Sequence, residues 1–235
     1  MGDFVSKQSR KSTTNGGRPP AKPIQSRGMV TSLHDRRGRR KYLLPKERKQ
    51  FLQAALEAGG KTATFCAVLA LSGARISEVL ALTPEQIDDE NGSINFETLK
   101  RRERGHIRAV PVPRHLLYYL DGVHRYRAAQ SDPKQARTHL WSWSRTTAWR
   151  RVKTVMRLAQ HPSYIAKPKS LRHAFGAEAA MSNVPLTMIK KWLGHARLET
   201  TEIYTTLVGK EERTLARRTW EMADDLFNSG APYDG

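Results

Sequence analysis

The chain has 235 residues and carries 41 Lys and Arg against 22 Asp and Glu, which gives a formal net charge of +19. This length fits one sizeable domain, or one domain with an additional arm. A charge so far from zero favours a polyanionic partner over a merely soluble basic protein. Cys66 is the only cysteine, so the sequence excludes a disulfide framework and a cluster of thiolate metal ligands.

The first 40 residues are rich in Ser, Thr, Gly, Pro, Lys and Arg and contain few apolar side chains. Such a segment cannot bury enough apolar surface to offset the entropy lost on ordering, so residues 1–40 are predicted to form a disordered basic arm. The arm ends in arginines that we expect to contact nucleic-acid phosphates, although a solvated tail explains them almost as well. These arginines are Arg36, Arg37, Arg39 and Arg40.

Folded structure is predicted over residues 41–228, followed by a C-terminal tail over 229–235. Pro45 suits the first turn of a helix, and Gly59-Gly60 ends it. Asn91-Gly92 is a strong turn signal before a hairpin whose strands are predicted over 93–99 and 107–112. The other predicted helices cover 61–71, 75–82, 114–129, a segment that starts near Ser144 and has Trp149 on its apolar face, and then 169–182, 185–193, 198–207 and 210–228. The sequence thus predicts an α+β fold that is mainly α-helical.

Four short motifs combine into one chemistry: GARISE at 73–78, SLRH at 170–173, LGH at 193–195 and IY at 203–204. Arginine is always charged and offers a rigid fork of donors, so Arg75 and Arg172 suit the two non-bridging oxygens of a phosphodiester. Tyr204 offers an oxygen nucleophile that can form a covalent phosphoester. A lysine on a loop can protonate the leaving oxygen. The pattern therefore indicates a nucleophilic attack on a phosphodiester.

These motifs resemble those of the catalytic domain of the tyrosine recombinase (phage integrase) family, and the resemblance covers about residues 41–228. It implies that GARISE and SLRHAFG carry the two catalytic arginines and that His195, nine residues before Tyr204, belongs to the same site. It also implies that Lys100, at the end of the first hairpin strand, is the catalytic lysine. The predicted catalytic residues are Arg75, Lys100, Lys169, Arg172, His195 and Tyr204.

Two departures from the family pattern affect these expectations. Lys169 stands where the family usually has a histidine, three residues before the second arginine. Positions i and i+3 share a helix face, so Lys169 and Arg172 can point at one phosphate; as a base for Tyr204, however, a lysine needs a lowered pKa. The family usually has a helical core-binding domain before the catalytic one, whereas only about 40 residues precede the predicted fold. This makes encirclement of DNA by the chain alone doubtful.

The expected partner is double-stranded DNA. Besides the arm, the residues predicted to bind it are Arg101, Arg102, Arg104, Lys190 and Lys191. Self-association on DNA is expected, as a tetramer in the synapse and as a monomer or dimer when free. We expect no cofactor and no metal, because the arginines neutralise the charge and the sequence has no paired metal-ligand spacing. No apolar stretch is long enough to cross a bilayer. The basic arm and the resemblance to recombinases lead us to expect a cytoplasmic protein of bacterial, phage or plasmid origin.

Two alternative interpretations remain open. Residues 185–200, with a helix, a glycine turn and a second helix, also resemble a helix-turn-helix, which favours a DNA-binding regulator or an accessory factor without catalytic activity. A regulator of that kind does not need Arg75, Arg172, His195 and Tyr204 together. A monomeric topoisomerase of type IB would use the same residues as a recombinase.

Overall fold

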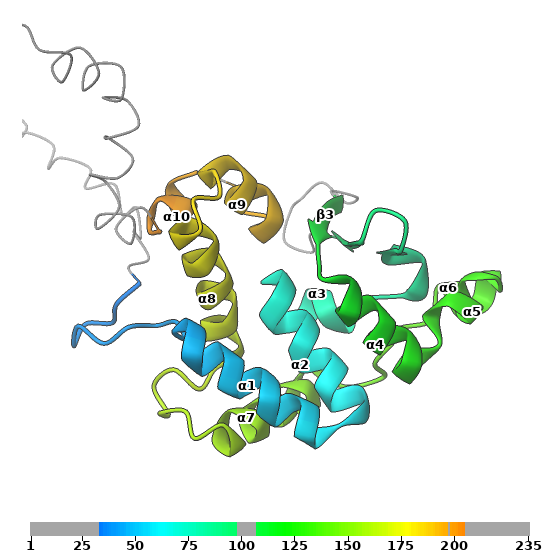
Figure 1. Cartoon of the computed structure of the whole chain (residues 1–235), viewed down its shortest axis with the longest axis horizontal. Coiled ribbons are helices and arrows are strands. Elements are labelled where there is room, and N and C mark those ends of the chain that lie inside the picture. The colour runs from blue at the N-terminus through cyan, green and yellow to red at the C-terminus, as the bar shows by residue number, and fades with distance from the viewer. Residues whose placement is uncertain (1–32, 98–106, 197, 205–235) are drawn as a thin grey trace, which may run out of the picture.

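The computed structural model describes residues 33–97, 107–196 and 198–204 as a mainly helical domain with a small antiparallel sheet at one side (Figure 1). The helices are α1 (Pro45–Ala58), α2 (Gly60–Ser72), α3 (Ile76–Leu80), α4 (Arg114–His124), α5 (Tyr126–Gln130), α6 (Pro133–Ala136), α7 (Arg145–Leu158), α8 (Pro168–Met181), α9 (Leu186–Leu193) and α10 (Glu199–Glu202), with a 3-10 turn η1 (Pro84–Gln86). The strands are β1 (Ile87–Asp88), β2 (Ser93–Glu97) and β3 (Ile107–Pro111), in that order in the sheet. The predicted α+β class, mainly helical with a small sheet, is confirmed.

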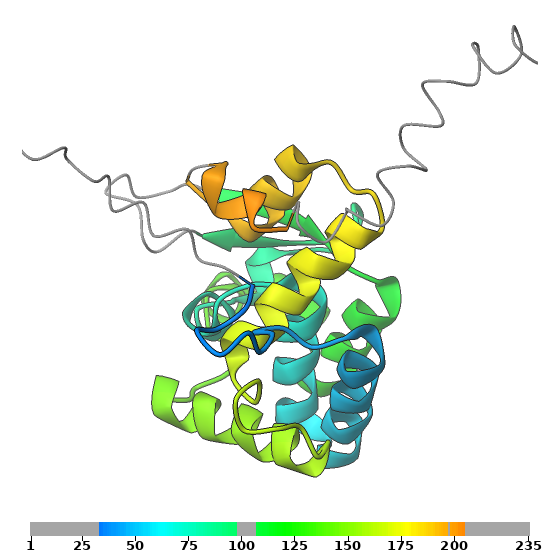
Figure 2. The same ribbon diagram turned by 90° about the vertical axis from the view of Figure 1, so that its left-hand side faces the viewer.

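Helix α2 is the centre of the hydrophobic core. It is buried along most of its length and packs against α1, α4 and α8 (Figure 2). Its sequence, GKTATFCAVLALS, is apolar on almost every face, as expected of a helix that is surrounded by others. Cys66 is fully buried in this helix. A rigid central helix fixes the position of its own C-terminal end, from which the chain passes to Arg75.

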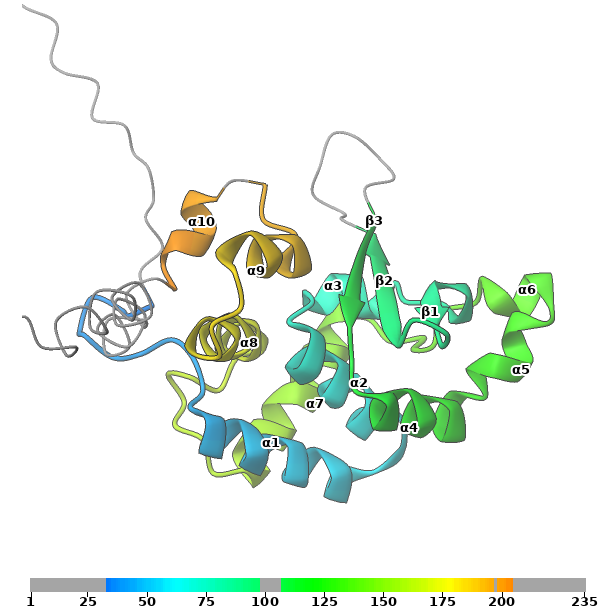
Figure 3. The same cartoon turned by 45° about the horizontal axis from the view of Figure 1, so that its top comes forward.

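The sheet confirms the predicted hairpin and adds one strand to it. Strands β2 and β3 rise beside α3 (Figure 3), with Ile94 opposite Val110 and Phe96 opposite Arg108. Ile94, Phe96 and Val110 are buried, as the alternating pattern predicts. Strand β1, which is only two residues long, pairs with β2 across the Asn91-Gly92 turn and is too short to leave a sequence signal.

Three predicted elements differ in detail from the observed ones. The helix predicted over 114–129 breaks at Arg125, which has a left-handed backbone (φ 51°), into α4 and α5. The helix predicted over 198–207 ends at Glu202, and Tyr204 lies in a turn within the described residues. Trp149 is 45% exposed, because it lies beside the buried stripe of α7 and not within it.

The last residues of the predicted arm, from Leu33 to Arg40, make contacts with the domain that begins at the predicted boundary. Leu33 is buried, and His34 and Arg40 form a β-bridge that closes a turn over 33–40. Arg40 donates to the Glu47 carboxylate at 2.5 and 2.6 Å and to the Tyr42 carbonyl at 3.1 Å. Leu33 and Arg40 therefore attach this turn to the domain. The rest of the predicted arm, residues 1–32, lies outside the described residues, as do the predicted helix over 210–228 and the tail over 229–235.

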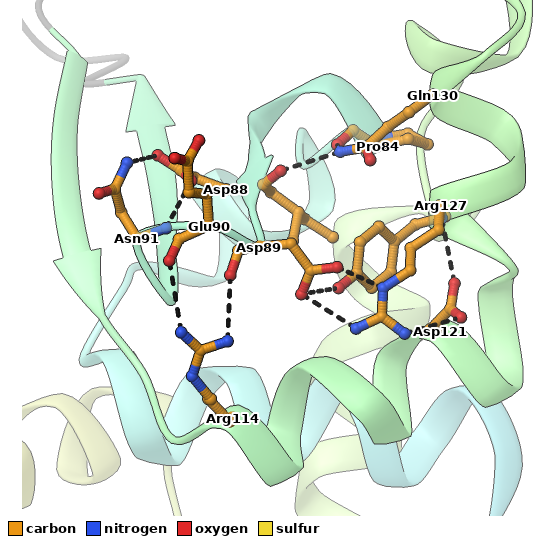
Figure 4. A network of polar contacts seen from close by, with 11 residues as sticks. Pro84, Asp88, Asp89, Glu90, Asn91, Arg114, Asp121, Arg127 and Gln130 are labelled. Carbon is orange, nitrogen blue, oxygen red and sulfur yellow. Dashed lines mark hydrogen bonds and ion pairs between the residues drawn. The ribbon is translucent and has the colours of Figure 1, made fainter.

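A polar network joins β1 to the α4–α5 corner (Figure 4). The Arg127 guanidinium donates to both carboxylate oxygens of Asp89 and, at 3.1 Å, to Asp121. The buried Tyr126 hydroxyl donates to Asp89 at 3.0 Å. The hydrogen bond from Arg127 is the main cause that lowers the pKa of Asp89. The charged side chains of this corner pair with one another, and the corner lies away from the motif residues.

Within the described ranges, every helix is too short or too polar to span a membrane.

Candidate active site

Arg75 is placed by the sharp turn between α2 and α3. Gly73 ends α2 with a left-handed backbone (φ 63°), and a Cβ there would lie 2.6 Å from the Phe175 side chain. Only glycine fits such a position without strain. Arg75 then caps α3, and the buried Glu78 carboxylate accepts from the Arg75 backbone N–H and from its guanidinium, each at 2.7 Å. The GARISE motif thus fixes the start of α3 and the base of the Arg75 side chain.

Arg172 lies on α8 and is only 9% exposed. Its guanidinium donates to the Gly73 carbonyl at 2.8 Å and to the Leu193 carbonyl. Burial, followed by the positive charge of Arg75, lowers the pKa of Arg172 to about 9, which still leaves it charged at neutral pH. The contacts of Arg172 bring together the C-terminal ends of α2 and α9 beside Arg75.

His195 follows Gly194, which ends α9 with a left-handed backbone (φ 61°). The His195 Nδ1 atom lies 2.9 Å from the Thr201 hydroxyl. Burial, and then the charges of Arg172 and Arg75, lower the pKa of His195 to about 3. The imidazole is therefore neutral at physiological pH, and the two arginines are close enough to influence it.

Tyr204 is 1% exposed and packs against α8. Its hydroxyl lies 3.4 Å from His173 Nδ1, and a Cβ at Gly176 would come within 2.4 Å of the tyrosine ring. Burial raises the pKa of Tyr204 to about 12, while Arg172 opposes this shift. Burial, followed by Lys169 and Arg172, lowers the pKa of His173 to about 4. The phenol is thus protonated at neutral pH and buried, and it lies close enough to Arg172 to be influenced by its charge.

The structure brings together four of the six predicted catalytic residues: Arg75, Arg172, His195 and Tyr204. Lys169 is exposed on α8, one turn before Arg172. Lys100 lies outside the described residues, as do the predicted DNA contacts Arg101, Arg102 and Arg104.

The remaining predicted DNA contacts lie on two parts of the surface. Lys191 is exposed and Lys190 half-buried in the last turn of α9. Arg36 and Arg37 are exposed, whereas Arg39 pairs with Asp35 at 2.8 Å and Arg40 with Glu47. Arg40 is therefore better explained as a structural residue, because its guanidinium is occupied inside the domain.

Two further features were missed from the sequence, and only the first of them belongs to the site. Arg108 on β3 is buried and donates to Glu78 at 2.6 Å and to the Trp192 carbonyl at 2.8 Å. Nothing in the local pattern distinguishes it from an ordinary strand residue.

Helix α7 has a face that carries a tryptophan and cations at four-residue spacing: Arg145, Trp149, Lys153 and Arg157. The residues of α7 include no Asp or Glu, and this charge imbalance is a signal that could have been found.

Among the residues that the structure describes, no group of three or more His, Cys, Asp or Glu side chains is arranged to hold a metal ion.

Comparison with known proteins identifies relatives of the chain. Residues 41–211 match the model of the phage integrase family. The chain is similar to tyrosine recombinase XerA of Pyrococcus furiosus, at 31% identity over 150 residues that cover 63% of this chain and 50% of the relative. It is also similar to tyrosine recombinase XerD of Yersinia pestis, at 27% identity over 154 residues that cover 63% of this chain and 50% of the relative.

Solved structures with the same fold include XerA recombinase, with a TM-score of 0.58 at 23% identity over 77% of this chain and 64% of that chain. XerH site-specific recombinase bound to difH substrate gives a TM-score of 0.59 at 18% identity over 73% of this chain and 55% of that chain. The chain spans about half the length of the curated relatives it matches.

Proposed function

Because the chain belongs to the phage integrase family, we propose that it is a site-specific DNA recombinase that cuts and rejoins strands through a 3′-phosphotyrosine at Tyr204. The observation that carries this proposal is the convergence of Arg75, Arg172, His195 and Tyr204 from distant parts of the sequence. The ends of α2 and α9 meet on the Arg172 guanidinium. A purely DNA-binding regulator has no need of that arrangement.

In the proposed reaction, the Tyr204 oxygen forms a bond to phosphorus and the bond from phosphorus to the 5′ oxygen breaks. Arg75 and Arg172 donate to the non-bridging oxygens, on which negative charge increases in the transition state. Neutral His195 adds a hydrogen bond to the same phosphate. The phosphoester energy is kept in the covalent intermediate, so that a 5′-hydroxyl of a partner strand can reverse the step without ATP.

Two protons have to move in this step. The phenol of Tyr204, whose pKa is about 12, must lose its proton as it attacks. Lys169 is the proposed acceptor, in its neutral amine form because an ammonium group cannot accept a proton, and it lies one helical turn from Arg172. Lys100 is the proposed donor to the leaving 5′ oxygen, which it converts into a hydroxyl.

The proposed DNA contacts extend beyond the motif residues. The face of α7 that carries Arg145, Trp149, Lys153 and Arg157 offers positive charge and an exposed indole. The Trp149 ring lies 5.7 Å from the Lys153 ammonium group. Together with Lys190, Lys191, the loop arginines 101, 102 and 104 and the basic arm, these groups provide sequence-independent attraction to phosphates. Self-association on DNA, with a tetramer in the synapse, belongs to the same proposal.

The test is covalent capture by Tyr204. The full chain is incubated with a pool of nicked suicide duplexes that carry randomised sequence and a label at the 5′ end of the strand to be cut, which stays with the phosphotyrosine, and adducts are separated on a denaturing gel and sequenced. The wild-type protein is expected to form an adduct, and Tyr204→Phe is expected to form none while its DNA affinity in a mobility-shift titration is unchanged.

Tyr164→Phe is the matched control, because Tyr164 is a partly exposed tyrosine outside the cluster. An adduct that survives in Tyr204→Phe and disappears in Tyr164→Phe would assign the nucleophile to Tyr164. Binding without any adduct in the wild-type protein would favour an accessory factor.

A further inference from the structure

The buried side chain of Arg108 connects three elements of the site: β3, α3 and α9. Its guanidinium donates to both oxygens of Glu78, at 2.6 and 3.3 Å, and its Nε donates to the Trp192 carbonyl at 2.8 Å. A Cβ at Gly194 would lie 3.1 Å from the Arg108 side chain, so the backbone just before His195 passes directly over it. β3, α3 and the end of α9 are thus held by one side chain.

Glu78 is the link between Arg108 and Arg75. Its carboxylate is 1% exposed and accepts from the Arg75 guanidinium as well as from Arg108. A buried carboxylate needs a partner for its charge. With Arg108 present, that requirement is met from β3, and the Arg75 side chain, which is 28% exposed, keeps guanidinium donors for another anion.

We propose that Arg108 is a positioning residue for strand cleavage: it pairs with the Glu78 carboxylate, which in turn holds the Arg75 guanidinium in place for donation to the phosphodiester, and it fixes the backbone that presents His195. Arg108 itself is 2% exposed, so it acts through Glu78 and the Trp192 carbonyl without touching DNA. This inference rests on the proposed function.

The role has a consequence for the pH dependence of cleavage. Burial opposes the ionisation of Glu78, but the charge and hydrogen bonds of Arg108, followed by those of Arg75, outweigh it and keep the pKa of that carboxyl below its usual value. The charged groups around Glu78 are Arg75 at the N-cap of α3, Arg108 on β3 and Arg172 on α8. Removing Arg108 takes away the largest effect that lowers the pKa of Glu78, so Glu78 takes up a proton at a higher pH. The neutral acid accepts only a weaker hydrogen bond from Arg75 and no longer holds that guanidinium by charge.

The experiment compares Arg108→Met with wild type in the covalent-capture assay, using duplexes recovered from the wild-type adduct. The single-turnover cleavage rate is expected to fall by about 10²-fold, as for the loss of one transition-state donor, whereas the affinity in a mobility-shift titration stays close to wild type. The variant is also expected to lose rate as the pH falls from 8 to about 5, near the usual carboxyl range. The double variant Arg108→Met/Glu78→Gln should lack this acid dependence.

Arg137→Met is the matched control, because Arg137 is 78% exposed at the end of α6 and pairs only loosely with Glu85, at 3.5 Å. Arg108→Lys serves if the methionine variant does not fold: it keeps the charge but loses the fork, and should recover the acid range of the pH profile with only part of the rate. Wild-type rate and pH profile in Arg108→Met would overturn the proposal. So would an equal loss of binding and cleavage without a new acid dependence. A wild-type protein that forms no adduct would instead contradict the proposed function.

Discussion

Arginine and carboxylate side chains form two clusters, one at the candidate active site and one at the α4–α5 corner. The two clusters differ in the ratio of arginines to carboxylates. At the corner, Arg127 donates to two carboxylates, Asp89 and Asp121 (Figure 4). At the site, Arg75 and Arg108 donate to the single carboxylate of Glu78, and Arg172 lies beside them with backbone carbonyls as its acceptors.

This difference separates a structural cluster from a cluster that can bind an anion. The corner carries more negative than positive charge and is partly exposed, so water and salt screen it and its ion pairs contribute little individually. The site carries an excess of positive charge that is largely shielded from water, where an added phosphate is attracted most strongly. The ratio of charges, more than the presence of arginine, thus indicates where DNA chemistry takes place.

The largest expected effect comes from deleting one arginine in each cluster. Arg172→Ala should lower the cleavage rate by about 10³-fold or more, because the transition state loses a fixed positive charge. Arg127→Ala should cleave at the wild-type rate, since that guanidinium contacts Asp89, Asp121 and the rings of Tyr118 and Tyr126 and none of the motif residues. Single-turnover covalent capture measures both. Equal losses in the two variants would remove the distinction drawn between the clusters.

A smaller effect is expected for Tyr126→Phe. The buried hydroxyl donates one hydrogen bond to Asp89, and its loss should destabilise the fold by about 1 kcal/mol and lower Tm by roughly 2–4 °C. A thermal melt by circular dichroism checks this, with Tyr118→Phe as the control because that ring is 57% exposed. Cleavage by Tyr126→Phe should remain at the wild-type rate, and a drop would mean that the corner communicates with the site.

The smallest expected effect is that of chelation. If the excess of arginine charge supplies the stabilisation, adduct formation in excess EDTA should proceed at the rate measured without it. Loss of cleavage on chelation, together with recovery on addition of Mg²⁺, would contradict a site in which guanidinium groups carry that charge. Adding Mg²⁺ to Arg172→Ala in the same assay shows whether a divalent ion can replace the missing guanidinium.

The order of elements and most of the site could be predicted from the sequence. Glycines at 73 and 194 mark helix ends, and the alternation of Ile94 and Phe96 marks a strand, because both signals are local. Arg125 could not be predicted as a helix break, since a left-handed backbone at a residue other than glycine is imposed by tertiary packing. Arg108 was missed for a related reason: its partners Glu78 and Trp192 lie 30 and 84 residues away, and only the fold brings them together.

The acceptors of Arg172 have a consequence for how the site tolerates change. Both are main-chain carbonyls at the C-terminal ends of helices, Gly73 after α2 and Leu193 at the end of α9. Such ends carry a partial negative charge of about half an electron from the aligned peptide dipoles. This negative charge neither titrates nor belongs to any side chain. No single substitution can delete these acceptors, because every residue keeps its main-chain carbonyl, although a substitution at Gly73 would displace them. The buried Arg172 is therefore anchored by the main chain and not by side chains.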